Sequence, residues 1–168
     1  MQENGPIKLR ARDVDDMRVL ASCLQDALVS VGDIAYLKRE KRFVLVANRF
    51  RWESRPQDPP GPETPEDPAD ARFEDQDAGP LYERVYCGLC FDRVKKVRYQ
   101  GFVPSHRDQI INLLTIEAEP RAVTLVFSGG AAIRLEVGAL ACHLEDLGEP
   151  WPTRWRPAHE AAGEAVRD

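Results

Sequence analysis

The clearest pattern in the chain is a pair of alternating stretches on either side of Gly129 and Gly130. Apolar side chains occupy every second position over residues 123–127 and again over residues 133–137. This alternation is typical of strands with one buried face, and paired glycines supply the positive φ angles of a tight turn. We therefore predict a β-hairpin. Beyond it the apolar spacing becomes helical, which predicts a helix over residues 138–147.

The N-terminal part has the pattern of a short strand followed by an amphipathic helix. Residues 7–11 alternate between apolar and polar side chains, as a strand does. Asp13 is a suitable helix N-cap, because its carboxylate can accept a hydrogen bond from a free backbone N–H of the first turn. Apolar residues continue at helical spacing as far as Leu28. We predict a helix of about four turns whose apolar stripe lies on a sheet.

Two further strands are predicted before residue 54. Residues 29–38 and 43–53 have β character, and the charged residues 39–42 between them indicate a solvated hairpin tip. In the second strand, alternation places Arg49 and Arg51 on one face and an aromatic pair on the other. The two arginines either bind an anion or a carboxylate-bearing partner, or pair with neighbouring carboxylates on an exposed face.

Arginine and tryptophan are concentrated at two places, next to residue 50 and near the C-terminus. These residue types are enriched among the residues that dominate binding energy at protein–protein interfaces. The alternative is that the C-terminal tryptophans hold a strap of chain against the body. The candidate binding residues are Arg49, Arg51, Trp52, Trp151, Arg154 and Trp155.

Residues 54–80 differ sharply in composition from the rest of the chain. They contain eight acidic and two basic residues and seven of the thirteen prolines. A segment with so few apolar side chains cannot bury enough surface to offset the entropy lost on ordering, so we expect a disordered, extended acidic insertion. The remainder holds 21 basic and 20 acidic residues. That balance argues against a nucleic-acid binder, which normally carries a basic excess.

The second half of the chain resumes the β pattern after the insertion. Residues 81–102 have strand character, and either Asp92-Arg93 or Lys95-Lys96 is the candidate hairpin turn between two strands. Residues 105–114 resemble a short helix capped by Ser105, and residues 115–118 can form a strand.

The expected fold class is α+β with a mostly antiparallel sheet. Residues 7–52 and 94–137 can both be interpreted as strand, helix, strand, strand, which favours two β-α-β-β-like halves merged in one body. The alternative is a pleckstrin-homology-like partial barrel with a C-terminal helix. In either case we expect one compact domain over residues 1–159, interrupted by the insertion, and a flexible tail over residues 160–168.

Candidate chemistry is sparse in this sequence. Cys87 and Cys90 form a CxxC pair, but they lie within a β pattern, where residues three apart point to opposite faces. Cys142 and His143 would be needed to complete a zinc site, yet neighbours on a helix diverge by about 100°. No nucleophile or phosphate-loop motif is present. We therefore expect no metal site and no cofactor.

The chain has no stretch of about 20 apolar residues that would span a membrane, and its first residues lack the pattern of a signal peptide. We expect a cytoplasmic protein with no membrane association. In that compartment the four cysteines are expected to be thiols.

Several stretches together resemble a known family. They are NRFRWE at 48–53, RV at 84–85, LEVGALACHLEDLGEPWPT at 135–153 and RP…H at 156–159. The chain is similar to an uncharacterised family of alphaproteobacterial proteins, the domain of unknown function number 2948. The resemblance implies a cytosolic bacterial protein, and it offers no catalytic or binding residues to carry over.

Two functional hypotheses follow. The first is a non-enzymatic interaction or regulatory module with a protein partner. The alternative is a small-molecule-binding protein or enzyme with a pocket between the two halves, using some of Arg49, Arg51, His106 and His143. The absence of a recognisable catalytic motif favours the first hypothesis. The oligomeric state does not follow from the sequence.

Overall fold

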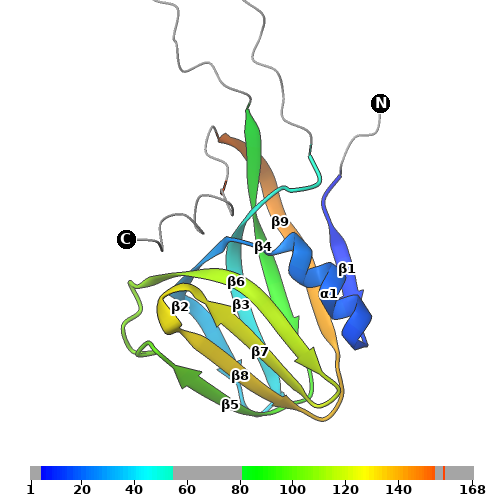
Figure 1. Ribbon diagram of the computed structural model, residues 1–168, viewed down its shortest axis with the longest axis vertical. Coiled ribbons are helices and arrows are strands. Elements are labelled where there is room, and N and C mark those ends of the chain that lie inside the picture. The colour runs from blue at the N-terminus through cyan, green and yellow to red at the C-terminus, as the bar shows by residue number, and fades with distance from the viewer. Residues whose placement is uncertain (1–4, 55–80, 154–156, 158–168) are drawn as a thin grey trace, which may run out of the picture.

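The computed structural model describes residues 5–54, 81–153 and 157 of the chain. The described strands form a single antiparallel sheet in the order β1-β9-β4-β3-β2-β6-β7-β8-β5, with one α-helix beside it (Figure 1). The strands are β1 Lys8–Ala11, β2 Ala27–Leu37, β3 Arg42–Phe50, β4 Tyr82–Phe91, β5 Val94–Gln100, β6 Ile110–Glu119, β7 Ala122–Phe127, β8 Ala132–Val137 and β9 Cys142–Thr153. The sheet-dominated α+β class predicted from the sequence is confirmed. The predicted insertion at 54–80 lies almost entirely outside the described residues, as does the tail at 160–168.

The hairpin predicted around the glycine pair is confirmed. Strands β7 and β8 are antiparallel neighbours, with Val123 opposite Leu135 and both side chains buried. A short 3₁₀ turn, Ser128–Gly130, joins them. Gly129 and Gly130 have φ angles of 72° and 79°, which side chains with a Cβ rarely adopt. The glycine pair therefore serves the turn, as its sequence pattern indicated.

The helix predicted over residues 138–147 is wrong, because this region enters strand β9. Along β9, buried Cys142 and Leu144 alternate with exposed His143 and Glu145. Short apolar runs fit a helix and a strand about equally well by spacing alone. Here β9 lies between β1 and β4 and pairs with both, so its backbone hydrogen-bonding groups are used on two sides. The hairpin predicted near residues 92–96 is also wrong, because β4 pairs with β3 and β9 while β5 pairs with β8. Neighbouring strands decide the outcome where the spacing does not.

The short helix predicted over residues 105–114 is also wrong. Residues 101–109 form an irregular loop, and the chain then enters β6, which pairs with β2 and β7. No α-helix lies within residues 94–137, all of which the structure describes. The interpretation as two β-α-β-β-like halves is therefore wrong. Of the partial-barrel alternative, the curved antiparallel sheet is present, whereas a helix at residues 138–147 is not.

Helix α1, Val14–Cys23, begins where the sequence predicted. The Asp13 carboxylate accepts a hydrogen bond from the backbone N–H of Asp16 at 2.7 Å, as an N-cap does. The helix is shorter than predicted, since β2 already begins at Ala27. Its buried face packs against the core, and the helix lies beside β1 and β6 (Figure 1).

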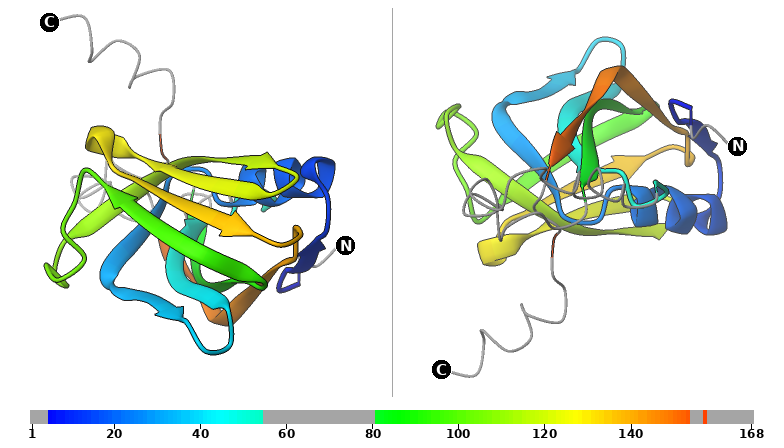
Figure 2. Two further views of the ribbon diagram at one scale, coloured as in Figure 1. Left: turned by 90° about the horizontal axis from the view of Figure 1, so that it is seen from below. Right: turned by 90° about the horizontal axis from the view of Figure 1, so that it is seen from above.

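The sheet bends strongly, so that its inner face encloses the hydrophobic core (Figure 2). On β3, alternate residues Phe43, Leu45 and Ala47 point into this core and are almost completely buried. Alternation directs the next residue in the series, Arg49, to the same side. Within the described residues, no helix is long and apolar enough to cross a membrane.

Candidate functional site

Arg49 lies at the end of the inward-facing row of β3 and has 0% exposed surface. A second charged residue enters the core from β9, where Asp146 follows Cys142 and Leu144 on the inner face. Its side chain is 2% exposed. Strand β4 lies between β3 and β9, and its Cys87 is opposite Ala47 of β3 on one side and Asp146 of β9 on the other. Two opposite charges are thus brought together beneath the sheet, where each needs a partner.

The hydrogen bonds of Arg49 use its whole guanidinium group. Its Nε and Nη2 atoms donate to the two carboxylate oxygens of Asp146, each at 2.7 Å. Its Nη1 and Nη2 atoms donate to the Glu53 carboxylate at 3.0 and 2.8 Å, and Nη1 also donates to the Phe50 carbonyl oxygen at 3.4 Å. These five bonds match the five N–H donors of arginine. No donor remains for an external anion.

The network continues to the surface through Arg51, which donates to Glu53 at 3.4 Å and to Glu83. We call Arg49, Arg51, Glu53, Glu83 and Asp146 the arginine centre. The charges alternate along it, with two cations between three carboxylates. Asp146 also accepts the backbone N–H of Ile7 at 2.8 Å. The centre therefore ties together the start of β1, the end of β3, the start of β4 and β9.

Electrostatics keep Arg49 and Glu53 ionised. Burial by itself lowers the pKa of Arg49, but hydrogen bonds to Asp146 and Glu53 more than compensate, so the pKa lies above its ordinary value. Burial raises the pKa of Glu53, and the hydrogen bonds and charges of Arg49 and Arg51 outweigh this, so the net pKa is lowered. A permanently charged, fully paired group is suited to holding structure rather than to transferring protons.

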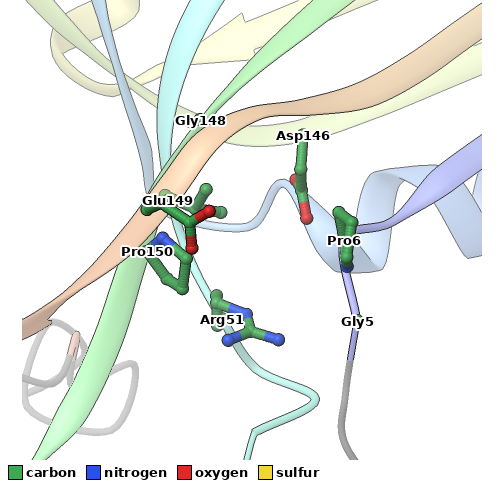
Figure 3. Close-up of a pocket in the computed structure, with 8 residues that line it drawn as sticks. Gly5, Pro6, Arg51, Asp146, Gly148, Glu149 and Pro150 are labelled. Carbon is green, nitrogen blue, oxygen red and sulfur yellow. The ribbon is translucent and has the colours of Figure 1, made fainter.

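A pocket of about 300 Å³ opens beside the centre (Figure 3). Arg51, Asp146 and Glu149 contribute its charged groups, and Pro6 and Val85 contribute apolar surface. Asp146 is already occupied by Arg49 and the Ile7 N–H. The pocket thus lies over a satisfied ion-pair network.

The structure does not bring the candidate histidines to this pocket. His143 faces outward on β9, with its Nε2 atom 4.0 Å from the Asp92 carboxylate. His106 is exposed in the loop before β6. The pocket beside the arginine centre therefore does not combine the two candidate histidines with Arg51.

The candidate tryptophans are distributed over separate places. Trp52 donates its indole N–H to the Gln25 carbonyl at 3.0 Å and packs on Phe50 with ring centroids 4.6 Å apart. Trp151 lies on β9 and packs on Tyr86 of β4 at 4.8 Å. The predicted residues Arg154 and Trp155 lie outside the described residues. Trp52 thus supports the fold, and Trp151 belongs to the outer face of the sheet.

Arg84 has a role that sequence reasoning missed. It is 4% exposed and donates to the Asn48 side-chain oxygen at 2.6 Å and to the Asn48 carbonyl at 2.9 Å. Burial lowers its pKa, and the charge of Asp26 opposes that effect. No local pattern distinguishes this arginine from an exposed strand residue, because its partner lies on a neighbouring strand.

The outer face of the sheet carries an exposed apolar cluster. Tyr86 and Leu147 lie directly opposite each other on β4 and β9 and are 52% and 43% exposed. Trp151 covers one side of Tyr86. A hollow of about 170 Å³ adjoins Tyr86, lined also by Leu28, Ser30, Asp33, Val46, Asn48 and Ile110. We call Tyr86, Leu147, Trp151 and this hollow the aromatic face.

The CxxC cysteines are separated by the strand, as their spacing predicted. Cys87 is buried on the inner face of β4, while Cys90 is half-buried with its sulfur 4.0 Å from an Asp92 carboxylate oxygen. Among the described residues, no three His, Cys, Asp or Glu side chains are grouped as a metal ion requires.

We expect the folded protein to react poorly with a thiol-directed disulfide reagent. Burial raises the pKa of Cys87 to about 12 and also raises the pKa of Cys142, so both remain inaccessible thiols. Burial raises the pKa of the partly exposed Cys23 and Cys90 as well, so they should react slowly. Counting released chromophore should show at most two sulfurs reacting, both slowly, in the folded protein and all four reacting in denaturant. Four thiols reacting at the rate of free cysteine would contradict the packing.

Comparisons with known proteins give one finding. No curated protein and no solved structure matches the chain. The family model described as "Protein of unknown function (DUF2948)" matches residues 7–159, which is most of the chain. The resemblance noted in the sequence is therefore confirmed, and the chain belongs to the DUF2948 family.

Proposed function

We propose that this chain is a non-enzymatic, cytoplasmic interaction module that binds a protein partner through its aromatic face. The exposure of Tyr86 beside Leu147 is the observation that carries the proposal. Exposed apolar side chains are ordinary when scattered, whereas a contiguous group on one surface is typical of binding sites. Tyrosine and tryptophan also bring large contact area at low entropic cost.

The hollow beside Tyr86 indicates the chemistry of the partner. Its walls combine aliphatic groups from Leu28, Val46 and Ile110 with the polar side chains of Ser30, Asn48 and Asp33. An apolar side chain from a partner would displace water there, and Tyr86 at the rim would exclude solvent. The partner is therefore a protein segment that presents a large apolar residue next to hydrogen-bonding groups.

The buried charges favour this face over the arginines as the binding surface. Arg49 has all its donors occupied by Asp146, Glu53 and a backbone carbonyl. Arg49 could bind an external anion only by breaking these hydrogen bonds, and the buried carboxylate of Asp146 would then lack a positive charge beside it. Binding an anion at Arg49 would therefore lose more free energy in broken ion pairs than the new contact would supply.

A photo-crosslinking amino acid at position 86 tests the proposal. The matched control is the same group at position 99, because Tyr99 is also a strand tyrosine and is 37% exposed, but lies on β5 at the other end of the sheet order. We expect a defined crosslinked partner from position 86 and none in common from position 99. Adding Leu147→Asp should reduce the crosslink about ten-fold or more, because a charge at the centre of a patch opposes desolvation.

Three outcomes would overturn the proposal. They are the same crosslinks from both positions, no crosslink from position 86, or a crosslink that Leu147→Asp leaves unchanged. Circular dichroism and a thermal melt of each variant separate lost binding from lost folding.

A further inference from the structure

A second surface, at the opposite end of the molecule from residues 54 and 81, is strongly basic. Residues 38–42 and 92–96 hold seven basic side chains against two acidic ones, in a chain whose net charge is −5. All seven basic residues are exposed. We call these two stretches the basic pole.

The fold brings the two stretches of the basic pole together. The backbone N–H of Val94 donates to the carbonyl of Lys41 at 2.8 Å, which joins the β2–β3 tip to the start of β5. Lys41, Arg93 and Lys95 line a shared pocket of about 360 Å³. Lys41 and Arg93 have φ angles of 53° and 57°, so both stretches turn sharply here and present their side chains outward.

The cations of the basic pole are mostly uncompensated. Within the described residues, Arg42 alone among the seven forms an ion pair, with Asp92 at 2.9 Å. Like charges held close together repel, and the resulting positive potential attracts an anionic partner. Because the stretches are exposed, this attraction is long-ranged at low ionic strength and weak in salt.

The chain contains a segment of complementary charge. Residues 58–77 include eight acidic side chains and one basic side chain. The described chain breaks off at Ser54 and resumes at Leu81, both at the far ends of β3 and β4 from the basic pole (Figure 1). Each molecule thus has its acidic segment attached at one end and its basic pole at the other.

The length of the segment favours docking between molecules. Strand β4, Tyr82–Phe91, which runs from the resumption of the described chain to the basic pole, spans at most about 30 Å at an extended rise of about 3.3 Å per residue. The midpoint of residues 55–80 can move at most about 43 Å from either attachment point on the same scale. Within one molecule only acidic residues near the centre of the segment could reach the pole, because Asp58 and Asp77 are each four residues, or about 13 Å, from the described chain. A second molecule is not held at that distance, so its pole can contact acidic residues along the whole segment.

We propose that the acidic segment, residues 58–77, of one copy docks on the basic pole of a second copy. The contact is heterologous, since different surfaces meet, so it extends into head-to-tail chains unless a ring closes. Its strength depends on ionic strength, because both surfaces are exposed and charged. This association uses a different surface from the aromatic face and stands or falls independently of it.

Sedimentation velocity over a range of protein concentrations tests the association. We expect the wild type to form dimers and larger species in 20 mM salt and to become monomeric in 500 mM salt. A pole variant, Arg93→Glu, Lys95→Glu, Lys96→Glu, and a neutralised variant, with Asn or Gln at the eight acidic positions, should each associate about ten-fold more weakly or not at all.

Mixing the pole variant with the neutralised variant tests directly whether the acidic segment of one molecule binds the pole of another. The neutralised variant keeps its pole, and the pole variant keeps its acidic segment, so together they can form one contact and no further growth. We expect a 1:1 dimer from the mixture. A control variant, Lys8→Glu, Arg10→Glu, Arg12→Glu, reverses three exposed charges near β1 and should associate like the wild type.

Four outcomes would overturn the proposal. A wild type that stays monomeric at low salt, association unaffected by the pole variant, or a mixture that forms no dimer would each do so. So would a monomeric wild type that expands when the pole is reversed, because that result places the docking within one molecule. Circular dichroism spectra and thermal melts establish that each variant is folded before its association is measured.

Discussion

Replacing Arg49 with alanine is expected to destabilise the fold by about 3–5 kcal/mol, the usual cost of removing one partner from a buried ion pair. Asp146 would keep its charge beneath the sheet with only the Ile7 N–H as a described donor. Glu53 would lose two hydrogen bonds at the same time. Chemical denaturation measured by tryptophan fluorescence gives the free energy of unfolding.

Arg98→Ala is the matched control for this prediction. Arg98 also pairs with a carboxylate, Glu136 at 3.8 Å, but its side chain is 61% exposed. Exposed pairs contribute at most about 1 kcal/mol, so a small change is expected. In the double variant Arg49→Ala, Asp146→Ala, the loss should be smaller than the sum of the single losses. Equal effects of Arg49→Ala and Arg98→Ala would show that the arginine centre is not a buried anchor.

Gly101→Ala should cost about 2–4 kcal/mol, combining a left-handed backbone with a steric overlap. Gly101 has a φ angle of 75°, and an added Cβ would overlap the carbonyl oxygen of Gly130. It would also lie 2.9 Å from the Cα of Ala131. Because these are backbone atoms, no side-chain rotation relieves the contact. Thermal and chemical unfolding of the purified variant measure the loss.

Gly129→Ala separates the two contributions. Gly129 has a similar φ angle of 72°, and an added Cβ meets no atom within 4 Å. The backbone cost of about 1–2 kcal/mol should therefore remain without the overlap. If Gly101→Ala and Gly129→Ala lower the free energy of unfolding by the same amount, the close approach between the loop after β5 and the β7–β8 turn is absent in solution.

Local patterns sufficed where the controlling interactions are local. The hairpin around Gly129 and Gly130 depends on backbone angles that glycine supplies, and the start of α1 depends on Asp13 and an N–H three residues away. The charged tip between β2 and β3 follows in the same way, since a solvated turn separates two strands. Each of these elements was predicted because its stabilising contacts lie within a few residues.

The candidate site was predicted only in part. The sequence placed Arg49 and Arg51 on the same side of a strand and allowed them carboxylate partners. It did not distinguish an exposed face from a buried one, because Asp146 lies 97 residues from Arg49 in the chain. Similarly, the contact between Trp151 and Tyr86 depends on the pairing of β9 with β4.

The sequence by itself determined the sheet-rich class, the first helix, the two hairpins and the family, because these follow from periodicity, turn chemistry and recognisable motifs. The tertiary structure alone decided that residues 142–153 form a strand, that Arg49 is an internal anchor, and that Tyr86 and Leu147 form an exposed face. In each case the deciding contact joins strands distant in sequence. Such contacts depend on which neighbour satisfies the backbone and which side of the sheet is covered, and periodicity carries neither.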